Sequence, residues 1–412
     1  MNASAGCCAG VFSVLTPPGR GGIAVVRCLG PAAVRAMEAC FRPPRAVQSP
    51  QMSPSLTGAN LREPPPAAPD LPDVGRLAYG HFVDAGGRPL DEIILYRAAE
   101  TVFEVNCHGG PAAVEAVCRH LAGLGLERVD PDRLLAHEGA GPIERDAERM
   151  LREARTPLAG RILLDQRNGA LARAIDKILK ALAAGLSAEA GKELDALLER
   201  WRGCGRLLAS PPRVAVAGPP NVGKSTLVNC LVGAERVLVS ATPGTTRDYV
   251  EADAAIEGLP VVLVDTAGLR ESGEAIEREG AARARREMRA AAVVVYLLDA
   301  VEGVRPEDEA ALEALGARAV AAWNKADLAT GPLGKPAAVA ISALTGDGIE
   351  ALAESVLARL GWRPPAAAGE AVPFTAAQAA AIERARDALA TGDSAAAKER
   401  LESLAGGATS AG

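Results

Sequence analysis

Nine residues at 218–226, Gly-Pro-Pro-Asn-Val-Gly-Lys-Ser-Thr, constrain the fold of this 412-residue chain more than any other segment. They match the pattern G-x-x-x-x-G-K-[ST] and lie between an apolar run at 213–217 and a segment of helical character. In that context the glycines permit a tight turn whose backbone N–H groups face phosphate oxygens. Lys224 adds a cation for the β- and γ-phosphates, and the Ser225 hydroxyl is a Mg²⁺ ligand. The alternative, a glycine-rich turn that only caps a helix, would not explain the three motifs that follow.

Those motifs complete a nucleotide site. Asp265-Thr-Ala-Gly268 ends an apolar strand, where an aspartate can hold the metal through water and a glycine lets the backbone approach the γ-phosphate. Asn324-Lys-Ala-Asp327 follows another strand, and the Asp327 carboxylate can accept guanine N1–H and N2–H₂, which adenine cannot offer together. Ser342-Ala343 can donate backbone N–H to guanine O6. The order of these motifs predicts binding of GTP rather than ATP. The predicted contacts are Gly218, Asn221, Val222, Gly223, Lys224, Ser225, Thr226, Asp265, Gly268, Asn324, Lys325, Asp327, Ser342 and Ala343.

Two features bear on hydrolysis. The segment from Ser240 to Asp248, Ser-Ala-Thr-Pro-Gly-Thr-Thr-Arg-Asp, offers a threonine that could complete the Mg²⁺ shell when γ-phosphate is present. A turn-rich loop between a helix and a strand is the simpler alternative. The water-orienting glutamine of Ras-like GTPases is replaced by Leu269, which cannot hydrogen-bond water. The nearby glutamates are candidates for that role, or they open a helix and suit its dipole: Glu271, Glu274, Glu277 and Glu279.

The chain divides into four regions that differ in predicted secondary structure and in proline and glycine content. Residues 1–120 contain short β-like runs and a helical stretch at 111–121, interrupted at 42–73 by a segment with nine prolines in 32 residues, which we interpret as an exposed insertion. Residues 121–210 have helical patterns at 142–155 and from about 164 to 201, broken near Gly185. Strands and helices alternate over 211–362, which predicts a mainly parallel sheet covered on both faces. Residues 363–412 predict one Ala-rich helix, about 375–389, and a Gly/Ser/Ala tail.

Composition excludes several classes of protein. The net charge is −6, and no half of the chain is a basic arm. Nucleic acid would therefore have to bind a local basic patch. Eight cysteines contain no C-x-x-C pair, which argues against a zinc site or a disulfide framework and suits a reducing compartment. The longest apolar run, 290–298, is too short to cross a membrane. We therefore expect a cytoplasmic protein that is not membrane-bound.

The flanking sequence identifies a resemblance. The G-T-T-R-D switch and the P-x-N-x-G-K-S loop resemble those of translation-factor-related bacterial GTPases. Three further segments resemble the N-terminal domain of the tRNA-modification GTPase family (MnmE/TrmE type): Thr16-Pro-Pro-Gly-Arg-Gly-Gly-Ile-Ala-Val-Val-Arg27, Gly75-Arg-Leu-Ala-Tyr-Gly-His81 and Glu104-Val-Asn-Cys-His-Gly-Gly-Pro111. Unlike that family, the chain has no cysteine after Cys230.

The resemblance implies an α/β P-loop GTPase domain (211–362) inserted in a split α-helical domain (121–210 and a truncated 363–412). An α+β, folate-binding-type dimerisation domain (1–120) would precede both. It implies K⁺-stimulated, dimerisation-activated GTP hydrolysis, with Glu277 as the catalytic glutamate and Thr246 as a Mg²⁺ ligand. The K⁺ ligands would be Asn221, Ser240, Thr242 and Thr245.

By the same resemblance, a tetrahydrofolate one-carbon derivative would contact Arg20. The partners would be a second copy of the chain, a flavin-dependent protein and tRNA, whose wobble uridine is modified. Two other interpretations stay open: a ribosome-assembly GTPase, and a degenerate paralogue that acts as a nucleotide-dependent scaffold.

Overall fold

The computed structural model describes residues 10–16, 21–44, 71–234, 251–265, 286–334 and 338–406. Contacts divide the chain into two compact units, 1–140 and 141–412. Most of the 42–73 segment lies outside the described residues. None of the helices in the described part of the chain is long and apolar enough to cross a membrane.

The first unit is a seven-stranded sheet with two helices on one face and a short third helix packed on part of the other. Its strand order is β3-β4-β5-β6-β2-β1-β7, antiparallel except for the β1–β7 pair. The elements are β1 (Val11–Val14), β2 (Ile23–Leu29), α1 (Pro31–Cys40), β3 (Phe41–Arg42), β4 (Leu77–Val83), β5 (Pro89–Ala99), β6 (Val102–His108), α2 (Pro111–Gly123), β7 (Glu127–Arg128) and α3 (Pro131–His137). Proline at the first helical position begins each of the three helices.

Strand alternation gives this sheet two different faces. One face buries alternate residues such as Val26, Leu95 and Val105 against the apolar sides of α1 and α2. The opposite face keeps Leu77, Tyr79 and Ile94 exposed. The second face is covered at Val11 and Leu29 by Leu134 of α3, so its open apolar part lies on β4 and β5.

The second unit contains a six-stranded sheet of order β13-β12-β11-β8-β10-β9, parallel except for β9. The central strand, β11, is buried along its whole length, as expected for a parallel sheet covered on both faces. The elements are β8 (Arg213–Ala217), α9 (Lys224–Ala234), β9 (Glu251–Ile256), β10 (Leu259–Asp265), β11 (Val293–Asp299), α11 (Pro306–Leu315), β12 (Ala319–Asn324), β13 (Val339–Ala340) and α12 (Ile349–Leu360).

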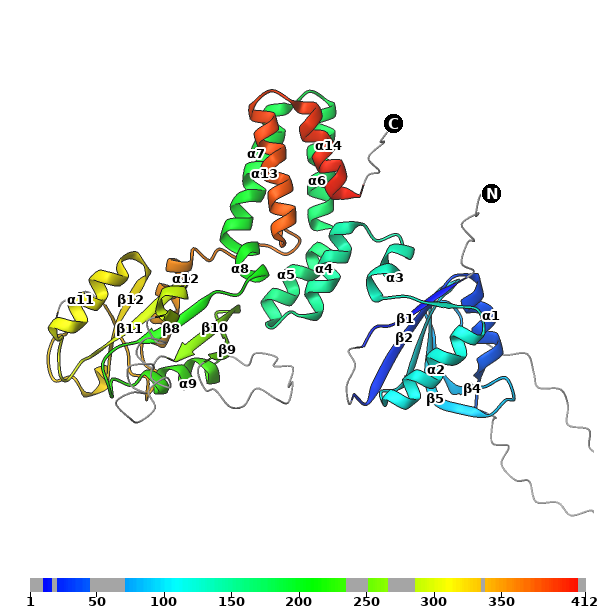
Figure 1. The fold of residues 1–412 in the computed structure, drawn as a ribbon, viewed down its shortest axis with the longest axis horizontal. Helices are drawn as coiled ribbons and strands as arrows, with labels where there is room; N and C mark the ends of the chain where they lie inside the picture. The colour runs from blue at the N-terminus through cyan, green and yellow to red at the C-terminus, as the bar shows by residue number, and fades with distance from the viewer. Residues whose placement is uncertain are drawn as a thin grey trace, which may run out of the picture. The chain divides into compact units, whose positions relative to one another are not determined.

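The rest of the second unit is helical and is formed by two segments, one before and one after that sheet in the sequence. The longer helices of this part are α4 (Pro142–Arg152), α5 (Pro157–Arg167), α6 (Ala170–Ala183) and α7 (Ser187–Arg200) before the sheet, and α13 (Ala376–Ala390) and α14 (Ser394–Ala405) after it; the short helix α8 (Arg206–Ala209) leads into β8. One core contains Leu171 and Leu194 from the first group and Ile382 and Leu401 from the second. In Figure 1, α13 (orange) lies beside α7 (green), and α14 (red) lies beside α6 (teal). The predicted fold class, a P-loop domain inserted in a split helical domain, is confirmed.

Several element predictions were wrong: helices α1 and α3 were not predicted, and three further differences follow. The predicted tail contains α14, which Asp393 caps by accepting the Ala396 N–H at 2.9 Å, and which buries Leu401. The long helical pattern from 164 breaks first at Gly169, which has a φ of 87°. Strand β9 was missed because its sequence, Glu-Ala-Asp-Ala-Ala-Ile, lacks the β-branched pattern of its neighbours.

Candidate functional site

The phosphate-binding loop begins at Gly218 and joins β8 to α9 at the carboxyl edge of the sheet. Two of its residues, Asn221 and Gly223, adopt positive backbone φ values, of 61° and 98°. A Cβ added at Gly223 would also lie 2.4 Å from Asn324 Nδ2. Glycine is therefore required at 223 both by the turn and by the close approach of the loop that follows β12.

Lys224 is the first residue of α9 and is buried. Its Nζ donates to the carbonyl oxygens of Gly218 at 3.2 Å and Pro219 at 2.7 Å. These bonds keep the ammonium group inside the curve of the loop. A phosphate in the loop would meet this cation and the positive end of the α9 dipole together.

The Ser225 hydroxyl, one residue later, donates to Asp265 Oδ2 at 2.6 Å. Asp265 is buried at the end of β10, so the sheet brings together two side chains 40 residues apart. A hydroxyl and a carboxylate are the oxygen donors that Mg²⁺ prefers, and the ion usually keeps waters as further ligands. This pair therefore fits a Mg²⁺ site next to bound phosphates.

Asn324 joins the phosphate-binding loop to the turn that follows β13. Its Nδ2 donates to the Val222 carbonyl at 2.6 Å, and its Oδ1 accepts the Ala343 N–H at 2.9 Å. Ser342 and Ala343 lie in the turn after β13, where the Gly346 N–H donates to the Ser342 carbonyl at 2.8 Å. Asn324 thus fixes the positions of two loops from its buried place at the end of β12.

Asp327 and Thr226 are exposed, and the Asp327 carboxylate lies just beyond this bridge, in the turn after β12. Its exposure leaves it accessible to a ligand with two neighbouring N–H donors, as guanine has. The structure thus places the described site residues at one edge of one sheet.

One buried carboxylate at this sheet edge was not named in the sequence analysis. Asp299 ends β11 next to Asn324, is buried, and accepts a hydrogen bond from Lys325 Nζ at 2.6 Å. The signal was an aspartate that ends a wholly apolar strand, as Asp265 does. Seven predicted site residues lie outside the described residues: Arg20, Ser240, Thr242, Thr245, Thr246, Gly268 and Glu277.

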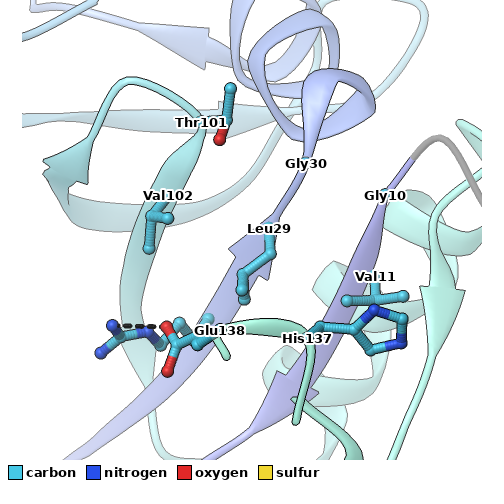
Figure 2. Close-up of a pocket in the computed structure, with 9 residues that line it drawn as sticks. Gly10, Val11, Leu29, Gly30, Thr101, Val102, His137 and Glu138 are labelled. Atoms are coloured by element: carbon cyan, nitrogen blue, oxygen red, sulfur yellow. Dashed lines mark ion pairs between the residues drawn. The ribbon is translucent and has the colours of Figure 1, made fainter. Parts of the chain in front are cut away.

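The first unit has a pocket of about 540 Å³ between the strand ends and α3. Figure 2 shows His137 and Glu138, from the end of α3, with strand residues such as Leu29. Arg27 forms ion pairs with Glu104 at 2.8 Å and Glu138 at 2.6 Å. Two carboxylates against one guanidinium make this pocket a poor site for an anion.

A glycine-rich turn lies at the other end of β2. The Gly109 N–H donates to the Gly22 carbonyl at 3.1 Å, so the chain just after Arg20 lies against the turn that begins α2. Beside it, Asp91 accepts the His108 N–H at 2.8 Å and contacts the same residue's Nδ1 at 2.6 Å. The Asp91 hydrogen bond raises the pKa of His108 above its ordinary value.

Comparisons with known proteins give a consistent result. The family described as "GTP-binding protein TrmE N-terminus" matches residues 10–131, and the family described as "50S ribosome-binding GTPase" matches residues 213–325. Curated relatives with the name "tRNA modification GTPase MnmE" cover most of the chain, as three of them illustrate. The relative from Aromatoleum aromaticum is 35% identical, over 77% of this chain and 73% of its own length. That from Moorella thermoacetica is 31% identical over 92% and 88%, and that from Parasynechococcus marenigrum is 34% identical over 91% and 84%.

Two solved structures are also similar in part. An Aquifex aeolicus Era variant bound to GDP and AlF4⁻ has a TM-score of 0.30 and 28% identity, over 43% of this chain and 66% of its own. The G domain of the T. maritima FeoB iron transporter has a TM-score of 0.26 and 30% identity, over 36% and 98%.

Proposed function

This chain belongs to the MnmE family of tRNA modification GTPases, and on that premise we propose that it hydrolyses GTP in a K⁺-stimulated, dimerisation-activated cycle that serves modification of the tRNA wobble uridine. The observation that carries the proposal is the single sheet edge where Lys224, the Ser225–Asp265 pair and the Asn324 bridge meet. That edge offers a cation, a hydroxyl–carboxylate pair for Mg²⁺ and the exposed Asp327 carboxylate, in the order in which GTP presents phosphate and base.

In this cycle the described residues bind and orient GTP. The loop N–H groups and the Lys224 ammonium hold the phosphates, and Ser225 with Asp265 would hold Mg²⁺, which neutralises charge that develops on the phosphate oxygens. Asp327, with the Ser342-Ala343 turn, selects guanine. We assign Glu277 the catalytic role, Thr246 the second Mg²⁺ contact and Gly268 the γ-phosphate contact, from the family resemblance.

The K⁺ site would be formed by Asn221 together with Ser240, Thr242 and Thr245. Asn221 supports this assignment because it is exposed on the phosphate loop, where its amide oxygen is a suitable ligand for a hard cation. Held beside the phosphates, K⁺ supplies the positive charge that an arginine finger supplies in other GTPases.

We assign the first unit to dimerisation and to binding a tetrahydrofolate one-carbon derivative. The open sheet face with Leu77, Tyr79 and Ile94 supports a homodimer, because an exposed apolar patch of this kind is typical of an interface. The turn of Gly22 and Gly109 supports a folate site near Arg20, since small residues let a flat ring approach the backbone. The further partners would be a flavin-dependent protein and tRNA in the cytoplasm.

The hydrolytic part is tested by comparing initial GTPase rates in equal concentrations of KCl and NaCl. We expect hydrolysis to be about ten-fold or more faster in KCl. The informative variant is Asn221→Gly, because glycine keeps the left-handed backbone of the loop while removing the amide oxygen. It should retain GDP binding and lose the difference between salts. Equal wild-type rates in both salts would contradict the K⁺ assignment.

The tRNA part is measured separately, as modified uridine formed with the flavin-dependent partner present. The match to the "50S ribosome-binding GTPase" family over 213–325 keeps a ribosomal role as the second candidate. Nucleotide-dependent cosedimentation with 50S subunits, without any modified uridine, would favour that role.

A further inference from the structure

The loop that follows β11 has an aspartate at its start that makes three short contacts. Asp299 pairs in register with Asn324 on β12 and is 4% exposed. Its Oδ1 accepts the backbone N–H groups of Val301 at 2.9 Å and Glu302 at 3.2 Å. Its Oδ2 accepts the Lys325 ammonium at 2.6 Å. Both oxygens are therefore occupied, and the carboxylate has no freedom to rotate.

Charge favours this arrangement as well. Burial alone would raise the pKa of Asp299, but the bonds from Lys325 and from the two loop N–H groups outweigh it and hold that pKa below its usual value. The carboxylate is thus ionised, and it attracts the one cation of the Asn-Lys-Ala-Asp motif.

The backbone of Lys325 reinforces the same geometry. Its φ of 63° and ψ of 33° are left-handed values that a residue with a side chain adopts only when neighbours fix them. On one side Asn324 ties the motif to Val222, and on the other the Ala326 N–H donates to the Ile341 carbonyl at 3.0 Å. The Lys325 side chain is held at its root by the backbone and at its tip by Asp299.

We propose that Asp299 is a positioning residue for guanine recognition, which acts by holding the Lys325 side chain extended along the position of the base. This proposal rests on the GTP-binding function described above. Lysine loses much rotamer freedom when a ligand orders it, so a stem that is already tethered makes base binding less costly. The bond to Asp299 also keeps the Lys325 ammonium away from Asp327, which lies two residues after Lys325. The Asp327 carboxylate is then available to accept the guanine N–H groups.

A double-mutant cycle on Asp299 and Lys325 tests this role, with the dissociation constant of fluorescent mant-GDP as the readout in the full-length protein. We expect Asp299→Asn to weaken binding about ten-fold, as for a lost charge-assisted hydrogen bond. Lys325→Ala should also weaken binding, and the double variant should match Lys325→Ala within about two-fold, because Asp299 acts only through the lysine. Effects that multiply in the double variant would overturn the proposal, as would unchanged affinity in Asp299→Asn.

Two further variants separate this role from simple stability. Asp308→Asn is the matched control, because Asp308 is a buried aspartate at the other end of the same loop that accepts from Tyr296 Oη and the Arg305 N–H, both at 2.9 Å. It should lower the melting temperature and leave mant-GDP affinity unchanged. Lys325→Met keeps the apolar stem without the tether and should bind as weakly as Asp299→Asn, so wild-type affinity would overturn the proposal. Wild-type protein that fails to bind would instead overturn the GTP-binding function and this proposal together.

Discussion

Asn324 shows how one side chain can hold a composite site together. Its amide uses one donor and one acceptor to connect loops whose residues, Val222 and Ala343, are more than 100 positions apart in the sequence. Both backbone groups are buried, so they would lack partners if the amide were removed. The residue is therefore important for stability as well as for nucleotide binding.

We expect Asn324→Ala to destabilise the second unit by about 2–4 kcal/mol, the cost of leaving two buried backbone groups unsatisfied. Mant-GDP affinity should fall at least about ten-fold, because the phosphate and base loops are no longer held in register. Urea unfolding and fluorescence titration measure the two effects. Asn229→Ala, at an exposed asparagine on α9, is the control and should change neither. A stable Asn324→Ala protein would show that the bridge is not needed for the fold.

The sequence was sufficient to name the candidate site residues that belong to recognisable motifs. Lys224, Ser225, Asp265 and Asn324 could be named because strand ends in a parallel sheet converge on one edge. Asp299 also ends an apolar strand, but its contact with Lys325 depends on the neighbouring strand, so the strand end alone did not indicate what it does. The bond between Ser225 and Asp265 likewise depends on a strand register that no motif encodes.

At the scale of elements, the second unit depends on a joint where the chain enters and leaves the G domain. A π-helix, Trp201–Gly205, precedes β8, and the Arg363 N–H of the returning chain donates to the Gly203 carbonyl at 2.8 Å. A Cβ at Gly205 would lie 1.8 Å from the Pro373 carbonyl oxygen. The outgoing and returning segments therefore pack backbone against backbone, which only glycine allows here.

Gly205→Ala should accordingly destabilise the second unit by about 1–3 kcal/mol, as overpacking does in a rigid interior. Gly191→Ala is the matched control, since nothing lies within 4 Å of an added Cβ there. That substitution, inside α7, should be neutral or stabilise by up to about 1 kcal/mol. Thermal unfolding of the two variants measures the difference, and equal stabilities would mean that the joint relaxes without cost.

Helix α14 shows why element prediction failed at the C-terminal side. Residues 394–405 are rich in alanine and charged groups and carry little apolar periodicity of their own. The helix is stable because Ala397 and Leu401 pack into a core built mainly by helices more than 190 residues earlier. Tertiary packing, which no local pattern records, decided its structure.

At the scale of the whole molecule, the apolar sheet face on β4 and β5 is exposed among the residues that the structure describes. Tyr79 and Ile94 are directly paired on β4 and β5 and are 51% and 42% exposed. A closed two-fold dimer would place this face against its own copy, so each substitution would act twice in one interface.

Ile94→Glu should therefore convert a dimer to a monomer, because two buried, unpaired carboxylates would enter the interface. Light scattering after size-exclusion chromatography measures the mass at several protein concentrations. Leu164→Glu places the same charge at an exposed leucine of α5 and should leave the mass unchanged. If the wild-type protein is a monomer throughout, the dimer assignment is wrong.

The split helical core also affects the order in which the domains can fold during synthesis. Gln378 Nε2 reaches Asp146 Oδ2 across 232 positions at 3.3 Å, and Ile143 shares a core with Leu401. At about 5–20 residues per second, the ribosome needs about 10–35 s to make the stretch from 201 to 373. During that interval α4 to α7 exist without the helices that complete their core, while the G domain can already fold. Nascent chains should thus expose the apolar surface of α4 to α7 until the last two helices emerge. Chaperones would bind this helical domain during that interval.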